Sequence, residues 1–176
     1  MEEKIIIAGF GGQGVLFIGR LLAYAALKAG IKVTWIPSYG PEMRGGTANC
    51  SVILSQEEIG SPIVEEADIV IAMNRPSIEK FMIRAKKGGV LLTNGNIASG
   101  INVSDDVALT EVPAPEKAEE LGNLNHANLV LLGYSLRYIK SLTFSDIEAG
   151  MQEMLKGKKE ALIIGNMRAI QVGVEL

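Results

Sequence analysis

The sequence predicts an α/β fold of the Rossmann-like type, a three-layer domain in which a mainly parallel sheet is flanked by helices. The unbroken β-branched run Ile5–Ala8 feeds a glycine turn and then an apolar helical segment, as expected of a strand buried on both faces of a parallel sheet. Further along the chain, apolar runs of strand length alternate with helical segments, which is the rhythm of βαβ units on one sheet. A chain of 176 residues can bury its own core, so we expect a single domain over residues 1–176.

The glycine turn, residues 9–14, carries the clearest local motif. Gly9, Gly11 and Gly14 match G-x-G-x-x-G between an expected strand and an expected helix over Val15–Ala29, and this context favours a functional turn. Backbone N–H groups at a helix N-terminus attract anions, so a phosphate or carboxylate is the expected guest. The alternative is that the glycines only let the helix pack closely on the strand.

The second expected strand, Lys32–Ile36, argues against a dinucleotide site. A dinucleotide-binding fold places an acid at the end of this strand to bind the ribose, but no Asp or Glu follows before Glu42. The strand leads into Pro37–Thr47, which contains two prolines and three glycines and should form a shaped loop beside the glycine turn. Arg44 is suited to a bidentate bond with a phosphate or carboxylate, and Glu42 would orient Arg44 or meet a partner's cation. An exposed ion pair on an ordinary turn is the alternative.

The remaining elements follow from hydrophobic periodicity and from helix-end signals. Expected strands are Ala48–Ser55, Asp68–Met73, Val90–Thr93 and Val107–Val112. Expected helices end at Gly30, run from Pro76 to about Lys86 and from Pro113 to about Leu121, cover Leu129–Ile139, and begin at a capping box formed by Thr143 and Asp146. Two apolar stripes should pack on the domain: Ile147, Met151, Met154 and Leu155, then Ile163, Met167, Ile170 and Val174.

Composition excludes several classes of function. A net charge of −3 offers no basic stripe, which argues against a nucleic-acid partner. Hydrophobic residues make up 48% of the chain, yet the apolar runs are too short to span a bilayer, so no membrane role is expected. No signal-peptide pattern is present, and we expect a cytoplasmic location. The high apolar content indicates a surface for a protein partner.

Two residue types occur once each. Cys50 is the only cysteine and His126 the only histidine, so this chain alone can hold neither a cysteine-ligated zinc ion nor an iron–sulfur cluster. We expect Cys50 to be a small buried core residue rather than a reactive thiol. We expect His126 to cap or pack a helix rather than to catalyse a reaction.

Several motifs together resemble one family. They are Gly9-Phe10-Gly11-Gly12-Gln13-Gly14-Val15, Ser38-Tyr39-Gly40-Pro41-Glu42-Met43-Arg44-Gly45-Gly46, Ile59-Gly60-Ser61-Pro62, and Asn125–Gly133. With the closing segment Asn166–Gly173, they are similar over nearly the whole chain to the gamma subunit of the 2-oxoacid:ferredoxin oxidoreductases. The chain length and the late pattern Asn166, Ala169, Gly173 look most like the 2-oxoglutarate type.

The resemblance implies that the chain is one subunit of an enzyme complex. In that family a 2-oxoacid and coenzyme A become an acyl-CoA and CO₂, and the electrons pass to ferredoxin. Thiamine diphosphate sits on the alpha and beta partners and iron–sulfur clusters on a beta or delta partner. The gamma domain would help to bind coenzyme A and would pack against the thiamine-binding subunits. No catalytic residue and no metal ligand is therefore expected in this chain, and the isolated chain should be inactive.

The resemblance also proposes a site. The residues expected to bind coenzyme A are Gly9, Gly11, Gly12, Gln13 and Gly14, which present backbone and amide donors, and Arg44, which acts as a charged clamp. The residues expected to shape the loop or meet a partner are Tyr39, Gly40, Pro41, Glu42, Gly45 and Gly46.

Three other interpretations remain open at this point. In the first, the chain is a structural docking subunit whose turn holds no ligand. In the second, it is a stand-alone NAD(P)-dependent oxidoreductase. In the third, it is the beta subunit of an indolepyruvate oxidoreductase, which shares this domain. The 2-oxoacid used, the stoichiometry of the complex, and whether the isolated chain forms a homodimer are also open.

Overall fold

The computed structural model describes residues 1–38 and 47–176, with the side chain of Thr47 left out. The predictions made for Tyr39, Gly40, Pro41, Glu42, Arg44, Gly45 and Gly46 therefore lie outside the described residues. The strands are β1 (Glu2–Phe10), β2 (Lys32–Ser38), β3 (Thr47–Ser55), β4 (Ala67–Ala72), β5 (Ala85–Asn94) and β6 (Ala108–Val112). The α-helices are α1 (Val15–Lys28), α2 (Arg75–Phe81), α3 (Ala114–Glu120), α4 (Ala127–Ser135), α5 (Phe144–Met154) and α6 (Glu160–Glu175), and the 3₁₀ turns are Met82–Arg84 and Leu124–His126.

The strands form one six-stranded sheet in the order β2-β3-β1-β4-β5-β6. Strands β1, β4, β5 and β6 are parallel to one another, which confirms the predicted mainly parallel sheet. Strand β3 runs antiparallel to both β1 and β2. The reason is chain length: residues 39–46 alone separate β2 from β3, whereas a parallel connection needs about a dozen residues or more.

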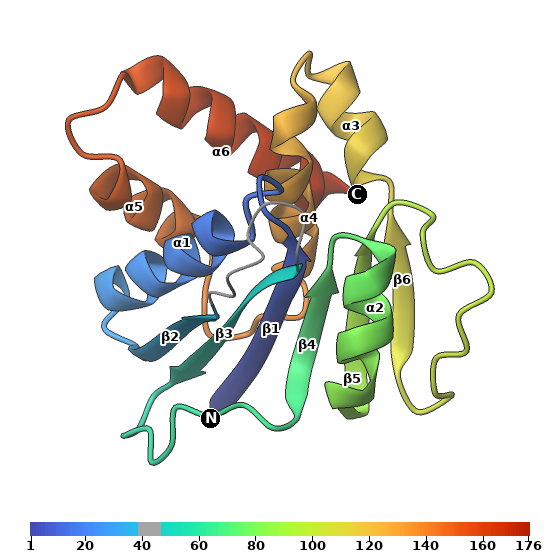
Figure 1. Ribbon diagram of the computed structural model, residues 1–176. Coiled ribbons are helices and arrows are strands. Elements are labelled where there is room, and N and C mark those ends of the chain that lie inside the picture. The colour runs from blue at the N-terminus through green and yellow to red at the C-terminus, as the bar shows by residue number, and fades with distance from the viewer. Residues whose placement is uncertain (39–46) are drawn as a thin grey trace.

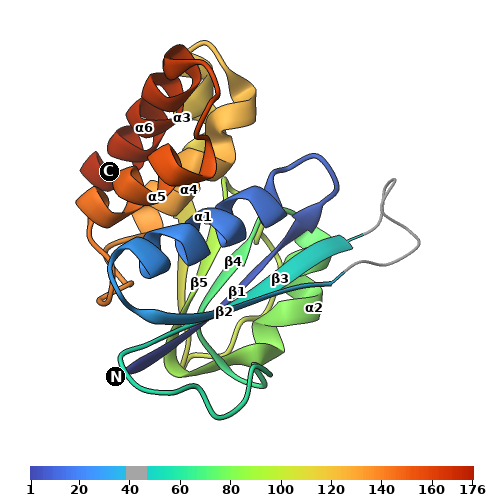
Figure 2. The same ribbon diagram turned by 90° about the vertical axis from the view of Figure 1, so that its left-hand side faces the viewer.

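Helices cover both faces of this sheet, as Figures 1 and 2 show. Alternate residues of β1 point to opposite faces because the side-chain period of a strand is two. Ile5 and Ile7 pack with α1, α4, α5 and α6 in one core. Ile6 and Ala8 pack in a second core with α2. The predicted burial of β1 on both faces is therefore confirmed.

Most helix ends lie where the sequence signals predicted them. Gly30 follows α1 with φ of +73°, the left-handed conformation common at helix ends. The Asn74 side chain accepts a hydrogen bond from the Ser77 backbone at the start of α2. Thr143 and Asp146 form the predicted capping box of α5.

Two predicted helices extend too far. The helix expected over Leu129–Ile139 ends at Ser135, as α4, and the other differs more. We expected helix from Pro76 to about Lys86, but α2 ends at Phe81 and β5 already begins at Ala85. Ala85 pairs with Ala67 of β4, and a register shift follows, which includes Gly88 with φ of +73°. Strand pairing thus extends β5 over residues that local sequence assigned to a helix and a turn.

Helices α4 and α6 cross with their backbones in contact. A Cβ atom on Gly133 would fall on the carbonyl oxygen of Ile170, and one on Gly173 would fall on that of Val130. Gly173 therefore lies at the crossing, and its neighbour Val174, expected in the buried stripe, is 38% exposed. The glycine of the late pattern on α6 is thereby explained as a helix contact.

We predict that Gly173→Ala destabilises the chain by about 1–3 kcal/mol, the usual cost of overpacking a close contact. The matched control is Gly165→Ala on the same helix, where a Cβ meets only His126 Cε1 at 3.7 Å. That change should be neutral or stabilise by up to about 1 kcal/mol, because alanine favours helix. Urea unfolding followed by circular dichroism measures both, and equal effects would contradict the close crossing.

Candidate functional site

The candidate site lies where the carboxyl ends of the parallel strands meet. Helix α1 follows β1 on one face and α2 follows β4 on the other, so the chain reverses its winding between these neighbouring strands. Open α/β sheets bind ligands at such a switch point. The strand ends that flank residues 39–46 lie at the same edge, because Thr47 pairs with Phe10 and Ser38 with Asn49.

Gln13 spans the gap between β1 and β4. Its Oε1 accepts hydrogen bonds from the Phe10 backbone at 2.7 Å and from Asn74 Nδ2 at 3.1 Å, and its Nε2 donates to the Met73 carbonyl at 3.1 Å. The Gln13 backbone N–H donates to the Phe10 carbonyl. The side chain that was expected to donate to a ligand is thus largely committed to holding the turn, and one Nε2 hydrogen remains.

Glycine occupies the different positions of the turn for different physical reasons. A Cβ on Gly9 would lie 2.8 Å from Val15 Cγ2, and one on Gly14 would fall on Asn128 Nδ2. These two positions are explained by packing. Gly12 has φ of +97° and nothing within 4 Å of its Cβ position, and Gly11 and Gly12 are exposed. Space for a ligand therefore exists at Gly11 and Gly12 rather than along the whole motif.

The N-terminus of α1 carries free donors. Its N-cap residue, Gly14, makes no side-chain cap, and no acid occupies the first turn of the helix. The backbone N–H groups of Gly11, Gly12 and Gly14 donate to no other residue in the described ranges. Such a helix end carries about half a positive charge. The arrangement can bind an anion.

A cleft of about 140 Å³ opens beside the turn. Its lining is Gly12, Gln13, Asn94, Leu124, Asn125, Ala127 and Asn128. We call this the carboxamide cleft, because four of these residues carry an amide side chain. Sequence reasoning missed Asn94 and Asn128 as lining residues, although Asn128 belongs to a quoted motif and Asn94 ends a strand at the ligand-binding edge.

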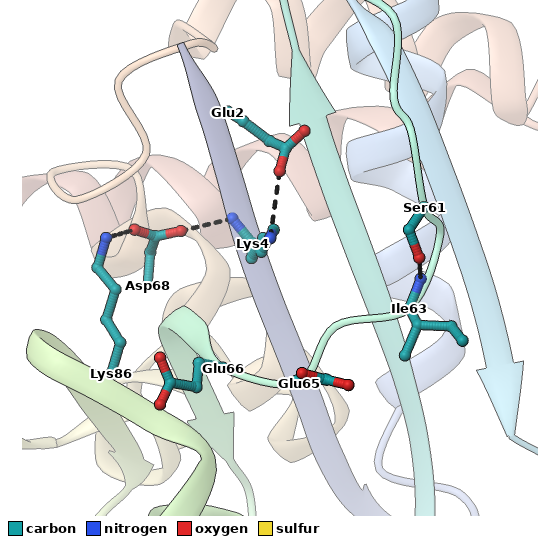
Figure 3. A pocket seen from close by; sticks show the side chains of 8 residues that line it. All are labelled: Glu2, Lys4, Ser61, Ile63, Glu65, Glu66, Asp68 and Lys86. Carbon is teal, nitrogen blue, oxygen red and sulfur yellow. Dashed lines mark hydrogen bonds and ion pairs between the residues drawn. The ribbon is translucent and has the colours of Figure 1, made fainter.

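A larger cavity, of about 630 Å³, lies at the opposite, amino-terminal edge of the sheet (Figure 3). Its acids are partly paired: Asp68 accepts a hydrogen bond from the Lys4 backbone and forms an ion pair with Lys86, while the Lys4 ammonium pairs with Glu2. These contacts tie β1, β4 and β5 together. We therefore infer that the charged groups around this cavity stabilise the edge of the sheet, and we place the candidate site at the glycine turn.

The single cysteine is buried as predicted, and the single histidine occupies the N-cap position of α4 without a side-chain cap. His126 Nε2 lies 3.1 Å from Asn123 Nδ2, and burial lowers the pKa of the imidazole. Cys50 is 1% exposed, and burial raises the pKa of its thiol to about 12, so the reactive thiolate is suppressed.

No cluster of potential metal ligands occurs within residues 1–38 and 47–176. None of the helices in that part of the chain has the length and apolar character needed to cross a membrane.

The fold is α/β, and its glycine turn has free backbone donors that can bind an anion; comparison with known proteins places the chain in a family. Residues 4–176 match the pyruvate ferredoxin/flavodoxin oxidoreductase family. The chain therefore belongs to that family, which confirms the resemblance drawn from its motifs.

Two relatives illustrate the match, both from Methanothermobacter thermautotrophicus. The ketoisovalerate oxidoreductase subunit VorA is 40% identical over 177 residues, which cover 99% of this chain and 36% of the relative. The 2-oxoglutarate synthase subunit KorC is 33% identical over 183 residues, which cover 100% of this chain and 95% of the relative. The chain thus spans about a third of the length of VorA and nearly all of KorC.

Two solved structures share the fold. The gamma subunit of a keto/oxoacid ferredoxin oxidoreductase from Geobacter sulfurreducens has a TM-score of 0.85 and 26% identity, covering 99% of this chain and 95% of that one. The 2-oxoglutarate:ferredoxin oxidoreductase from Magnetococcus marinus, with 2-oxoglutarate, coenzyme A and succinyl-CoA bound, has a TM-score of 0.88 and 22% identity, covering 99% of this chain and 30% of that one.

We predict that His126 titrates below its ordinary value of 6.5 in the native chain, because burial disfavours the imidazolium. Its contribution to stability is then complete above pH 6.5 and is lost as the pH falls from 6.5 to the native midpoint. Imidazole NMR signals report the midpoint without ambiguity, since the chain has one histidine. A native midpoint at or above that measured in urea would contradict the burial effect.

Proposed function

We propose that this chain is the gamma subunit of a 2-oxoacid:ferredoxin oxidoreductase. The complex would convert a 2-oxoacid, coenzyme A and two oxidised ferredoxins into an acyl-CoA, CO₂, a proton and two reduced ferredoxins. The observation that carries the proposal is the uncapped N-terminus of α1 behind the glycine turn, in a chain that matches the family from residue 4 to residue 176. Similarity over 95% of the length of KorC supports the assignment to a gamma subunit.

Within such a complex this chain contributes binding and assembly rather than chemistry. One cysteine cannot hold an iron–sulfur cluster, which needs about four thiolates. Thiamine diphosphate and the clusters would therefore sit on alpha, beta or delta partners. The chain's own part would be to hold coenzyme A so that its thiol meets the acyl group on those partners. Alone, it would be inactive.

Coenzyme A fits the glycine turn because it carries a pyrophosphate. The backbone N–H groups of Gly11, Gly12 and Gly14 would donate to a phosphate, while Gly9 and Gln13 hold the turn in shape. Arg44 would act as the charged clamp from the neighbouring loop. The other loop residues, Tyr39, Gly40, Pro41, Glu42, Gly45 and Gly46, would meet the thiamine-binding subunits. The bound coenzyme A in the Magnetococcus marinus enzyme supports this ligand.

Two 2-oxoacids are candidates for the substrate. Nearly complete coverage of KorC supports 2-oxoglutarate, which is also the type that the late motif of α6 resembles. The higher identity to VorA supports ketoisovalerate. The pocket for the 2-oxoacid would lie on the partner subunits, so both acids should be assayed on the assembled complex.

A stand-alone NAD(P)-dependent enzyme is less well supported. Strand β2 ends at Ser38, and no acid lies at its end to bind the ribose. If the chain were a purely structural docking subunit, the free N–H groups of the glycine turn would have no ligand to bind.

The first test is an anaerobic pull-down of the full chain from its native host. We expect partners that contain thiamine diphosphate and iron, and turnover of a 2-oxoacid only when they are present. Recovery of the chain without such partners, or turnover by the chain alone, would overturn the proposed role.

The role of the glycine turn is tested by Gly12→Ala in the assembled complex. The added methyl group enters the open space of the turn, so we expect the KM for coenzyme A to rise about tenfold, equivalent to about 1.4 kcal/mol. The matched control is Gly30→Ala, which has a similar left-handed backbone, with φ of +73°, and equally open surroundings but follows α1 at its other end. Equal KM values for the two variants would remove Gly12 from the coenzyme A site.

A further inference from the structure

Two residues that line the carboxamide cleft carry an amide oxygen that has no hydrogen-bond donor among the described residues. Asn94 Oδ1 and Asn128 Oδ1 are buried without a hydrogen-bond partner among the described residues, and both residues line the cleft beside Gly12. Buried polar groups in folded proteins are nearly always satisfied. Two unsatisfied oxygens at one small cleft therefore indicate a missing donor.

Contacts with the glycine turn hold the Asn128 side chain in position. It is 8% exposed, and its Nδ2 faces the Gly14 carbonyl at 3.5 Å. That contact fixes the amide orientation, because only the NH₂ group can face a carbonyl oxygen favourably. The Gly14 position leaves no room for a Cβ atom beside Asn128 Nδ2. The anion-binding turn and Asn128 thus form one packed unit.

The chemistry of the cleft differs from that of the turn. Its lining contains no charged side chain, so its side chains do not attract a phosphate strongly. Its unsatisfied side-chain atoms are oxygens, which accept hydrogen bonds only. A volume of about 140 Å³ is the room of about five water molecules at roughly 30 Å³ each. This is space for one amide unit or one base, and not for a whole cofactor.

We propose that the carboxamide cleft binds an uncharged, N–H-bearing part of the ligand whose anionic part lies on the glycine turn, with Asn94 and Asn128 as the acceptors. This inference rests on the proposed function, in which the ligand is coenzyme A. Two parts of coenzyme A have that chemistry: the amides of pantetheine and the amino group of adenine. An N–H donor from the ligand would end the cost of leaving these two oxygens unpaired.

The test uses the assembled complex with neutral and anionic probes. Pantetheine and adenosine are tried separately as inhibitors competing with coenzyme A, and inorganic pyrophosphate probes the glycine turn. Asn94→Ala and Asn128→Ala should each raise the KM for coenzyme A about five- to tenfold, the effect of one lost hydrogen bond. Each should weaken inhibition by one neutral probe by the same factor and leave inhibition by pyrophosphate unchanged. Which probe responds identifies the part of coenzyme A in the cleft.

One control lies outside the cleft. Asn96→Ala removes an exposed amide two residues from Asn94 that does not line the cleft, and it should change neither constant. Asn94→Asp keeps an acceptor oxygen and should retain inhibition by the neutral probe. If Asn128→Ala fails to fold, Asn94→Ala decides the matter.

Two outcomes distinguish a failure of the proposed carboxamide cleft from a failure of the proposed function on which it rests. If pyrophosphate inhibits while neither neutral probe responds to the asparagine variants, the carboxamide cleft is not a ligand site, although the proposed function stands. If pyrophosphate fails to inhibit and Gly12→Ala has no effect, the proposed role of the glycine turn is overturned instead.

Discussion

The Gln13 carboxamide is the interaction on which the site depends. It joins the Phe10 backbone at the end of β1 to Met73 and Asn74 at the end of β4. Asn74 in turn caps α2, so helices on opposite faces of the sheet start from one hydrogen-bonded unit. Because an amide offers both donors and an acceptor, it can satisfy backbone groups that strand pairing leaves free at the switch point. A carboxylate or an apolar side chain of similar length could not do this.

The size of a cavity is a poor guide to function in this molecule. A cavity of about 630 Å³ lies at the amino-terminal edge of the sheet, where Lys4, Asp68 and Lys86 already pair with one another or with nearby groups. The carboxamide cleft has less than a quarter of that volume, yet two of its lining residues carry buried acceptors that have no donor among the described residues. Unsatisfied polar atoms carry a free-energy cost, and a ligand can remove that cost only where it exists.

The glycine motif combines two physical demands that its pattern cannot separate. Gly9 and Gly14 are required because side chains of Val15 and Asn128 occupy the space of a Cβ atom. Gly12 is required by its backbone conformation and borders open space. Packing therefore explains the absence of a side chain at Gly9 and Gly14, whereas open space for a ligand is found at Gly12. Gly133 and Gly173 show packing alone, at a helix crossing far along the chain from the turn.

The sequence by itself determined the fold class, most helix ends and the positions of the glycine turn, Cys50 and His126, because these depend on local periodicity, capping and burial. Only the tertiary structure decided where β5 begins, that Gln13 is committed to the turn, and that Asn94 and Asn128 share one cleft. Those features arise from contacts between residues far apart in the chain: Gln13 meets Asn74, and Gly14 meets Asn128. A pattern along one strand or helix contains no information about such pairs, since the partner's position is set by the sheet order and by helix packing.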